Sequence, residues 1–421
     1  MDATATFVNR GRRGTTFKDG QREPVHRWFT ITPSYAPALV ADCAAHLGLT
    51  AGDHMLDPFA GAGTTAVWCR LAARPCTSIE WNPALAFVTR VKATLSLPPS
   101  DLTSAGARFA AAWRAELPPP AQAGAYLRAH AAHLPRIAYP ERWWDEATLA
   151  TLTAARRLLA LDTGDGPARP GLELALLRLL LPVSRARYSH ASVTFDPRAR
   201  APAPAEIVAA FGERVAEMAA DLALLAGRPQ RLGEVIRGNA LDLPAVVPEP
   251  GRYTRVICSP PYPNRYSYAR ETRPHLFFLD LVADGRAVGD LECAALGGTW
   301  GRATSLLAQP HAPEPAVVEP LLRGRLPALR AAHPLMANYA VRYFNDLWRH
   351  VQGLSQAMAP RARLAYVVGN SKLGGVDIPA ADWLAALFET AGWRRIGDGV
   401  YPMRRRNSRP GLVESVVFVE R

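Results

Sequence analysis

Four residues suited to holding a planar amino group stand early in the second half of the chain. Residues 253–258 are mostly apolar and β-branched, which predicts a short buried strand, and Ser259, Pro260, Pro261 and Tyr262 follow it directly. Proline has a locked φ angle and no N–H, so the pair ends the strand and holds its neighbours in fixed positions. The Ser259 hydroxyl and the Pro260 carbonyl then become preset hydrogen-bond acceptors beside the Tyr262 ring. On their own, the same four residues are equally typical of a plain strand followed by a proline turn.

A glycine-rich turn earlier in the chain has the features of a nucleoside site. The segment DPFAGAGTT (57–65) follows a short predicted strand at 54–56 and opens a predicted helix at 65–73. Such a turn points backbone N–H groups and a helix N-terminus at the carboxyl edge of the sheet, where open α/β sheets bind ligands. The next predicted strand, 76–79, is followed by Glu80, about twenty residues beyond the glycines, which is the spacing expected of a carboxylate that binds ribose hydroxyls.

These residues need a sheet that brings the carboxyl ends of its strands together. The hydrophobic patterns predict α/β structure in three pieces, at 33–96, 232–282 and 336–421. The last piece holds predicted helices and strands in alternation, at 339–358, 363–368, 381–391 and 414–419.

Three other segments do not follow the α/β pattern. Residues 1–32 are polar and basic and are predicted to form an arm that is flexible or orders against a ligand. Residues 97–231 are predicted to be an inserted, mainly helical domain, with helical runs at 145–161 and 171–181. Residues 283–335 are rich in proline and glycine and are predicted to form a second, irregular insertion.

The charge of the chain favours a polyanionic partner. The 421 residues carry 49 lysines and arginines against 37 acidic residues, a formal net charge of +12, and such a field attracts nucleic acid. All of the basic residues except Lys18, Lys92 and Lys372 are arginine, and alanine and proline are plentiful, which a GC-rich genome would also produce. Composition therefore supports a nucleic-acid partner only modestly.

Membrane, disulfide-rich and zinc-binding classes are not expected. The longest apolar stretch, 172–183, contains Glu173 and Arg178, and the first residues lack the apolar core of a signal peptide, so a cytoplasmic location is the default expectation. The five cysteines show no paired spacing, which argues against a disulfide framework or a metal site.

Arginines alternate with aromatic residues at the end of the helical segment. The stretch SRARYSHASVTFDPRARAPAP (184–204) carries Arg185, Arg187, Arg198 and Arg200 with aromatic side chains between them. This pattern suits contact with phosphates and stacking on bases, and it suits a solvated loop of an arginine-rich protein equally well.

Three of these features stand in one order along the chain: DPFAGAGTT, Glu80 and SPPY (259–262). Together they resemble the S-adenosylmethionine-dependent amino-methyltransferases of DNA, over about 33–96, 232–282 and 336–421. In that family the first element is the cofactor loop, the acidic residue binds the ribose, and a Ser, Asn or Asp followed by two prolines and a Tyr or Phe is the catalytic site on an exocyclic amine. The resemblance implies an α/β, Rossmann-like methyltransferase sheet interrupted by the two insertions.

The resemblance also implies the ligands. S-adenosylmethionine is the expected cofactor and duplex DNA the expected partner, joined by a cognate restriction endonuclease where the enzyme belongs to a restriction–modification system. The cofactor contacts carried over from the family are Asp57, Phe59, Gly61, Gly63 and Thr64 at the methionine part, Glu80 at the ribose, Trp81 and Asn239 at the adenine, and, by a weaker match, Phe29, Thr30 and Ser34.

The Ser-Pro-Pro-Tyr form is usual in enzymes that methylate N4 of cytosine. The resemblance implies that Ser259 and the Pro260 carbonyl accept the two amine hydrogens, so that the nitrogen lone pair points at the methyl group, while Pro261 helps to hold the turn. Tyr262 would stack on a base flipped out of the duplex. The segments 97–231 and 283–335 would contribute to DNA recognition, with Arg185, Arg187, Arg198, Arg200 and Arg265 as DNA contacts.

One feature departs from the N4-cytosine subgroup. Most of its members place the tetrapeptide before the cofactor loop, whereas here Asp57 precedes Ser259, the order commoner among N6-adenine enzymes. An N6-adenine DNA methyltransferase, an RNA amine methyltransferase and a non-catalytic nucleic-acid-binding protein therefore stay as alternatives. Cys258 as the nucleophile of a C5-cytosine enzyme is disfavoured, since in those enzymes the cysteine follows a proline in a loop.

Overall fold

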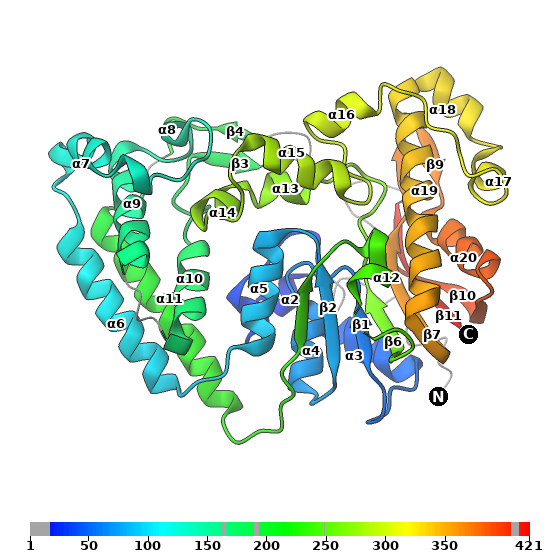
Figure 1. Cartoon of the computed structure of the whole chain (residues 1–421), viewed down its shortest axis with the longest axis horizontal. Coiled ribbons are helices and arrows are strands. Elements are labelled where there is room, and N and C mark those ends of the chain that lie inside the picture. Colours follow the sequence, from blue (N-terminus) through cyan, green and yellow to red (C-terminus); the bar gives the residue numbers. More distant parts are fainter. Residues whose placement is uncertain (1–16, 162–165, 189–192, 200, 248, 406–411) are drawn as a thin grey trace.

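A seven-stranded sheet forms the centre of the protein, in the order β10-β11-β7-β6-β1-β2-β5 (Figure 1). The computed structural model describes residues 17–161, 166–188, 193–199, 201–247, 249–405 and 412–421. The strands are β1 (Met55–Asp57), β2 (Cys76–Glu80), β5 (Glu234–Arg237), β6 (Tyr253–Cys258), β7 (Met358–Gly369), β10 (Arg394–Arg405) and β11 (Val413–Glu420). Strands β5, β2, β1, β6 and β7 are parallel, and β11 is antiparallel to both β7 and β10.

The strand order reverses in the middle of the sheet. From β1 the chain moves outward through β2 to β5, and it then returns to β6 on the other side of β1. Met55 of β1 lies beside Arg255 of β6, so both strands end at the same edge, β1 at Asp57 and β6 at Cys258. In open α/β sheets, ligands bind outside the carboxyl ends of the strands at such a reversal.

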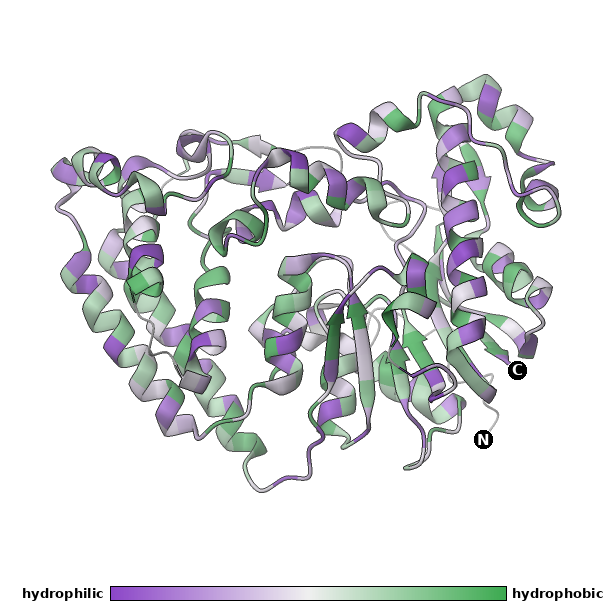
Figure 2. Cartoon of the chain, in the orientation of Figure 1, coloured by the Kyte–Doolittle hydropathy of each residue, from purple (hydrophilic) through white to green (hydrophobic). Residues whose placement is uncertain are grey.

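The sheet buries both faces because alternate residues of a strand point to opposite sides. On one face, α3 (Pro37–His46) and α4 (Thr64–Leu71) pack on Met55, Ile257, Val367 and Phe418. On the other face, α19 (Pro334–Ala357) and α20 (Ala380–Thr390) pack on Leu56, Val256, Tyr366 and Val417. Figure 2 shows hydrophobic residues concentrated on the strands and polar residues along the outer surfaces of the helices.

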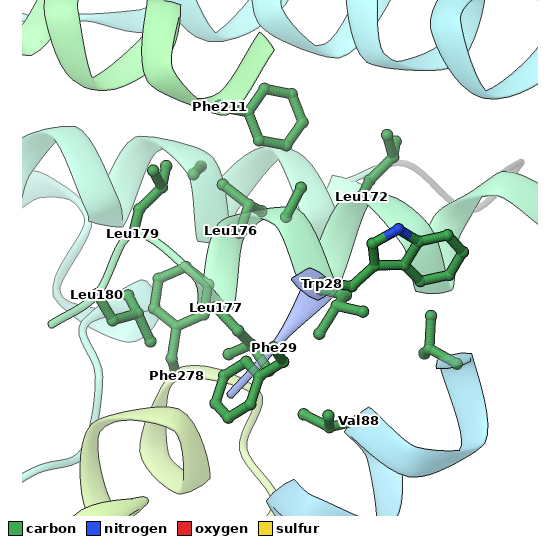
Figure 3. Close-up of a cluster of buried hydrophobic side chains, with 14 of the residues drawn as sticks. Trp28, Phe29, Val88, Leu172, Leu176, Leu177, Leu179, Leu180, Phe211 and Phe278 are labelled. Carbon is green, nitrogen blue, oxygen red and sulfur yellow. The ribbon is translucent and has the colours of Figure 1, made fainter. Parts of the chain in front are cut away.

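A group of helices lies beside the sheet, on the left of Figure 1. It contains α6 (Pro99–Glu116), α7 (Ala123–Ala129), α8 (Pro140–Trp143), α9 (Glu146–Leu161), α10 (Arg169–Leu177) and α11 (Pro204–Leu225), with a small hairpin of β3 (Ala186–Tyr188) and β4 (Val193–Phe195). Figure 3 shows Leu172 and Phe211 of this group in one cluster of buried side chains with Val88 of α5 (Pro83–Thr94) and Phe278 of α14 (Arg273–Phe278). One core therefore joins the helical segment to α5 and α14.

The described residues 17–32, predicted as part of an arm that is flexible or orders against a ligand, pack on the folded protein. Val25 and Trp28, around η1 (His26–Trp28), are fully buried, and α2 (Phe17–Gly20) precedes them. The buried Asp221 of α11 accepts hydrogen bonds from the Val25 N–H at 2.9 Å and from Trp28 Nε1 at 2.8 Å, and it pairs with Arg27. Basic residues dominate the local sequence, but an acidic partner about 190 residues away anchors the segment.

The segment 283–335 is also more regular than predicted. It contains α15 (Gly285–Ala294), α16 (Arg302–Leu306), α17 (Val318–Leu322) and α18 (Leu326–Ala332), after α13 (Tyr268–Glu271). Proline does not break these helices: in α18, as at the start of α19, it occupies the first helical turn, where its missing N–H costs nothing.

Other predicted elements are close to the observed ones, with three additions. The predicted helices at 145–161 and 339–358 are confirmed as α9 and α19, and the strands at 363–368 and 414–419 lie within β7 and β11. The edge strand β10, the hairpin of β8 (Ser371–Leu373) and β9 (Val376–Ile378), and the hairpin β3–β4 were not predicted. In β10, three glycine or proline residues between 397 and 402 hide the alternation, and register shifts mark this region.

Candidate active site

A cavity lies at the carboxyl ends of β1, β2, β5 and β6. Most of the residues singled out from the sequence line it: Ser34, Phe59, Gly61, Thr64, Glu80, Trp81, Asn239, Ser259 and Pro261. Asp57, Gly63, Phe29, Thr30, Pro260 and Tyr262 are not among its lining residues. The two sequence motifs, about 200 residues apart, thus face one space.

The glycine turn takes a shape that needs glycine at two positions. Gly61 and Gly63 have φ angles of 54° and 82°, in the left-handed region, and α4 begins directly afterwards at Thr64. A Cβ on Gly63 would lie 3.1 Å from the Thr89 side chain, so the absence of a side chain at Gly63 lets the turn pack closely on Thr89. A Cβ on Gly61 would meet only Ile31, at 4.0 Å, so the space beside Gly61 is open to the cavity.

Glu80 holds the glycine turn with its carboxylate. Oε2 accepts the Gly61 N–H at 2.7 Å and Oε1 accepts the Asn82 N–H at 2.7 Å. Asn82 in turn caps α5, because its Oδ1 accepts the Ala84 N–H at 3.0 Å. Removal from water raises the pKa of Glu80 to about 7, although these N–H donors favour the ionised form.

Asp57 is buried at the end of β1 and is not among the residues that line the cavity. Its side chain is fully buried, Oδ1 accepts the Phe59 N–H at 3.1 Å, and Oδ2 has no partner among the described residues. Burial and, to a lesser degree, the charge of Glu80 raise the pKa of Asp57 to about 8. Asp57 therefore shapes the turn through Oδ1, and its contact with a cofactor stays a prediction.

The N-terminal segment reaches the cavity through Ser34 and Tyr35. The Ser34 and Thr64 hydroxyls lie 3.0 Å apart, and the Tyr35 and Thr65 hydroxyls lie 2.6 Å apart. Phe29 is buried against His275, with ring centroids 5.3 Å apart, and so belongs to the core. The buried Lys92 donates from Nζ to the carbonyls of Phe29 and Ala62, which ties this segment to the glycine turn.

Trp81 and Asn239 both bond to the cover of the cavity. Trp81 Nε1 donates to the Leu291 carbonyl at 2.9 Å, and Asn239 Nδ2 donates to the Ala294 carbonyl at 2.8 Å. Asn239 Oδ1 accepts the Leu241 N–H at 3.0 Å, at the start of η5 (Ala240–Asp242), and this oxygen retains a second lone pair.

Helix α15 and the residues after it form this cover, which the sequence did not reveal. Leu291, Glu292, Ala295, Leu296 and Gly298 line the cavity. Glu292 is buried and accepts the Ser267 hydroxyl at 2.7 Å and the N–H groups of Thr299 and Trp300 at 2.9 and 3.0 Å. No motif marks these residues, and the carbonyls of Leu291 and Ala294 bond to Trp81 and Asn239, which lie 210 and 55 residues away.

Ser259 and Pro261 present the turn after β6 to the cavity. Ser259 Oγ donates to the Val367 carbonyl of β7 at 2.9 Å, which leaves its lone pairs free to accept. Its Oγ lies 3.5 Å from the Tyr262 hydroxyl, and the Tyr262 ring packs so closely on Gly369 that a Cβ there would lie 2.9 Å from two ring carbons. Cys258 is fully buried, and burial raises the pKa of its thiol well above the ordinary value, which does not favour a nucleophilic thiolate.

Two further tyrosines line the cavity next to this turn. Tyr266 and Tyr268 follow the tetrapeptide, with ring centroids 5.0 Å apart in an edge-to-face arrangement. The spacing of aromatic residues in the stretch RYSYA (265–269) was the available signal in the sequence.

Three of the predicted DNA-contacting arginines, Arg185, Arg187 and Arg198, lie around the hairpin β3–β4. Arg187 and Arg198 are exposed, and Arg187 lies 3.9 Å from Asp196. Arg185 is partly buried, and its N–H donates to the Trp143 carbonyl at 2.7 Å. Arg265 follows the turn after β6 and has a left-handed φ of 60°, and Arg200 lies outside the described residues.

Comparison with known proteins gives one weak match. No protein-family model matches the chain. The chain is 26% identical over 83 residues to the type II methyltransferase M.BsoBI of Geobacillus stearothermophilus, a stretch that covers 20% of this chain and only 16% of that protein. In the described part of the chain, no helix combines the length and apolarity needed to cross a bilayer, and no group of three or more His, Cys, Asp or Glu side chains could hold a metal ion. The sequence similarity supports a methyltransferase.

Proposed function

We propose that the protein transfers a methyl group from S-adenosylmethionine to N4 of cytosine in duplex DNA. The observation that carries the proposal is that Glu80 and Ser259 line one cavity, at the point where the strand order of a parallel sheet reverses. A carboxylate suited to ribose hydroxyls and an acceptor suited to an amine thus share one space.

The lining of the cavity fits this cofactor. The open space beside Gly61 would admit the methionine part of the cofactor close to the backbone. The Glu80 carboxylate can accept ribose hydroxyls, and Trp81 offers an apolar ring to the adenine. The cofactor supplies an electrophilic methyl group on a positively charged sulfonium.

The residues of the chain would act by positioning. An exocyclic amine is a weak nucleophile because its lone pair is delocalised into the ring. Ser259 Oγ, whose own hydrogen is donated to Val367, and the Pro260 carbonyl would accept the two amine hydrogens and turn the lone pair toward the methyl group. Direct transfer needs no covalent intermediate, which agrees with the buried position of Cys258.

Base flipping and DNA contact complete the proposal. The target base would have to leave the duplex to reach Ser259, and Tyr262 would stack on it. The exposed arginines of the hairpin β3–β4 and the segments 97–231 and 283–335 would hold the DNA, which agrees with the net charge of +12.

A second candidate is an N6-adenine DNA methyltransferase, favoured by the order in which Asp57 precedes Ser259. We give more weight to Ser259, because it would touch the reacting group. The order of the two motifs along the chain does not alter the sheet that positions them.

Mass spectrometry of nucleosides from DNA treated with the purified protein and S-adenosylmethionine tests the proposal. We expect N4-methylcytosine. N6-methyladenine would overturn the choice of base, and 5-methylcytosine would overturn the mechanism. Methylome sequencing of a host that expresses the protein would also report the modified site, which is the site that a cognate restriction endonuclease would cut.

A further inference from the structure

The turn after β6 has few backbone N–H groups that could hold it. Pro260, Pro261 and Pro263 have no N–H group, so the stretch 259–263 can donate only from Ser259 and Tyr262. Hydrogen bonds that involve side chains therefore hold much of the turn. The Ser259 hydroxyl holds one end, on β7.

Tyr343 of α19 holds the other end. Its hydroxyl donates to the Pro261 carbonyl at 2.7 Å, and Pro261 lines the cavity. The Pro260 carbonyl thus lies between two anchored residues, Ser259 and Pro261.

The packing around Tyr343 gives its ring one position. The residue is fully buried, with Phe344 in edge-to-face contact at 5.0 Å between centroids. Gly297 has a φ of 67°, and a Cβ there would lie 3.0 Å from Tyr343 Cδ2, so only glycine fits beside the ring. Burial raises the pKa of the Tyr343 hydroxyl well above the ordinary value, which keeps the phenol protonated as a donor.

We propose that Tyr343 is a positioning residue for methyl transfer: its hydrogen bond to Pro261 keeps the Pro260 carbonyl directed at the target amine. This inference rests on the proposed function. A small rotation of the peptide between the two prolines would turn this acceptor away from the amine, and transfer depends steeply on such alignment.

The test compares Tyr343→Phe, which keeps the ring and removes the hydroxyl, with wild type on a duplex that the wild-type protein methylates. Tyr401→Phe is the control, since it also removes a tyrosine hydroxyl, one that donates to the Ile396 carbonyl within β10 and lies outside the cavity lining. We expect kcat of Tyr343→Phe to fall about tenfold, the worth of one hydrogen bond, with KM for DNA and cofactor affinity within about twofold of wild type. Tyr401→Phe should keep the wild-type kcat.

Two outcomes would overturn the inference while leaving the proposed function intact. One is an unchanged kcat in Tyr343→Phe. The other is a joint loss of thermal stability, cofactor affinity and kcat, which would make the hydrogen bond a structural one. If the wild-type protein transfers no methyl group to DNA, the proposed function itself fails, whatever Tyr343 does.

Discussion

The N–H of Gly61 and the carboxylate of Glu80 meet at 2.7 Å, so the end of β2 directly holds the turn that follows β1. The second oxygen of the same carboxylate binds the Asn82 N–H at 2.7 Å, at the start of α5. One side chain therefore ties two loops together and also faces the cavity.

Glu80→Gln should weaken S-adenosylmethionine binding by about 10- to 100-fold, because hydrogen bonds to a charged group are worth about 1.5–3 kcal/mol. Isothermal titration measures the affinity, and circular dichroism checks the fold. Glu234→Gln is the control, since that carboxylate lies at the amino end of β5 and accepts the Thr77 hydroxyl. Equal affinities in both variants would remove Glu80 from the cofactor site.

Asp57→Asn should make stability less dependent on pH. The folded-state pKa values of Asp57 and Glu80, about 8 and about 7, lie above their ordinary values of 3.8 and 4.5. The contribution of both groups to stability is therefore fully present below about pH 4 and is lost as the pH rises through 7 to 8. Urea unfolding at about pH 5 and about pH 9 should show a smaller loss for Asp57→Asn than for wild type. Parallel losses would mean that Asp57 ionises freely in the folded protein.

Ser259→Ala should lower the rate of methyl transfer by about tenfold or more, since its hydrogen bond strengthens as the amine nitrogen becomes pyramidal. Cofactor and DNA affinity should change little. Single-turnover kinetics separates transfer from binding. In the control Ser355→Ala, the lost hydroxyl donates to the Val351 carbonyl within α19 and accepts from Trp393 Nε1, both outside the cavity lining, and the rate should stay at the wild-type value.

Replacing both Arg187 and Arg198 by alanine should weaken DNA binding on all sequences. The slope of log affinity against log salt should fall by about 2, because each phosphate contact contributes about 0.9. Filter binding over a salt series measures the slope. The control is the pair Arg361 and Arg394, which are also exposed but lie on β7 and β10. An unchanged slope would mean that Arg187 and Arg198 make no phosphate contacts and that this region is a solvated loop.

Asp221→Ala should destabilise the protein by about 3–5 kcal/mol, the cost of breaking a buried ion pair from one side. It also leaves the Val25 N–H and Trp28 Nε1 without an acceptor. Glu213→Ala, an exposed change on the same helix, should stay within about 0.5 kcal/mol of wild type. If the two variants are equally stable in denaturant titrations, Asp221 does not anchor the N-terminal segment.

Local patterns predicted much of the sheet and the two motifs. The strands that became β2, β6 and β11 could be recognised because alternation and β-branching act over a few residues. Gly61, Gly63 and the prolines at 260 and 261 marked their turns because these residues restrict or permit particular backbone angles by themselves.

The sequence by itself determined that a glycine turn and a Ser-Pro-Pro-Tyr turn each follow a strand, and the structure made these two strands neighbours. Only the tertiary structure decided what surrounds them: α15 covers the cavity, although Leu291 lies 210 residues from Trp81, and Tyr343 holds Pro261 from 82 residues away. It also decided that Asp57 is buried outside the cavity lining and that Val25 and Trp28 belong to the core. Such contacts depend on how distant elements pack. The local conformational preferences of a segment do not specify which other segment it packs against.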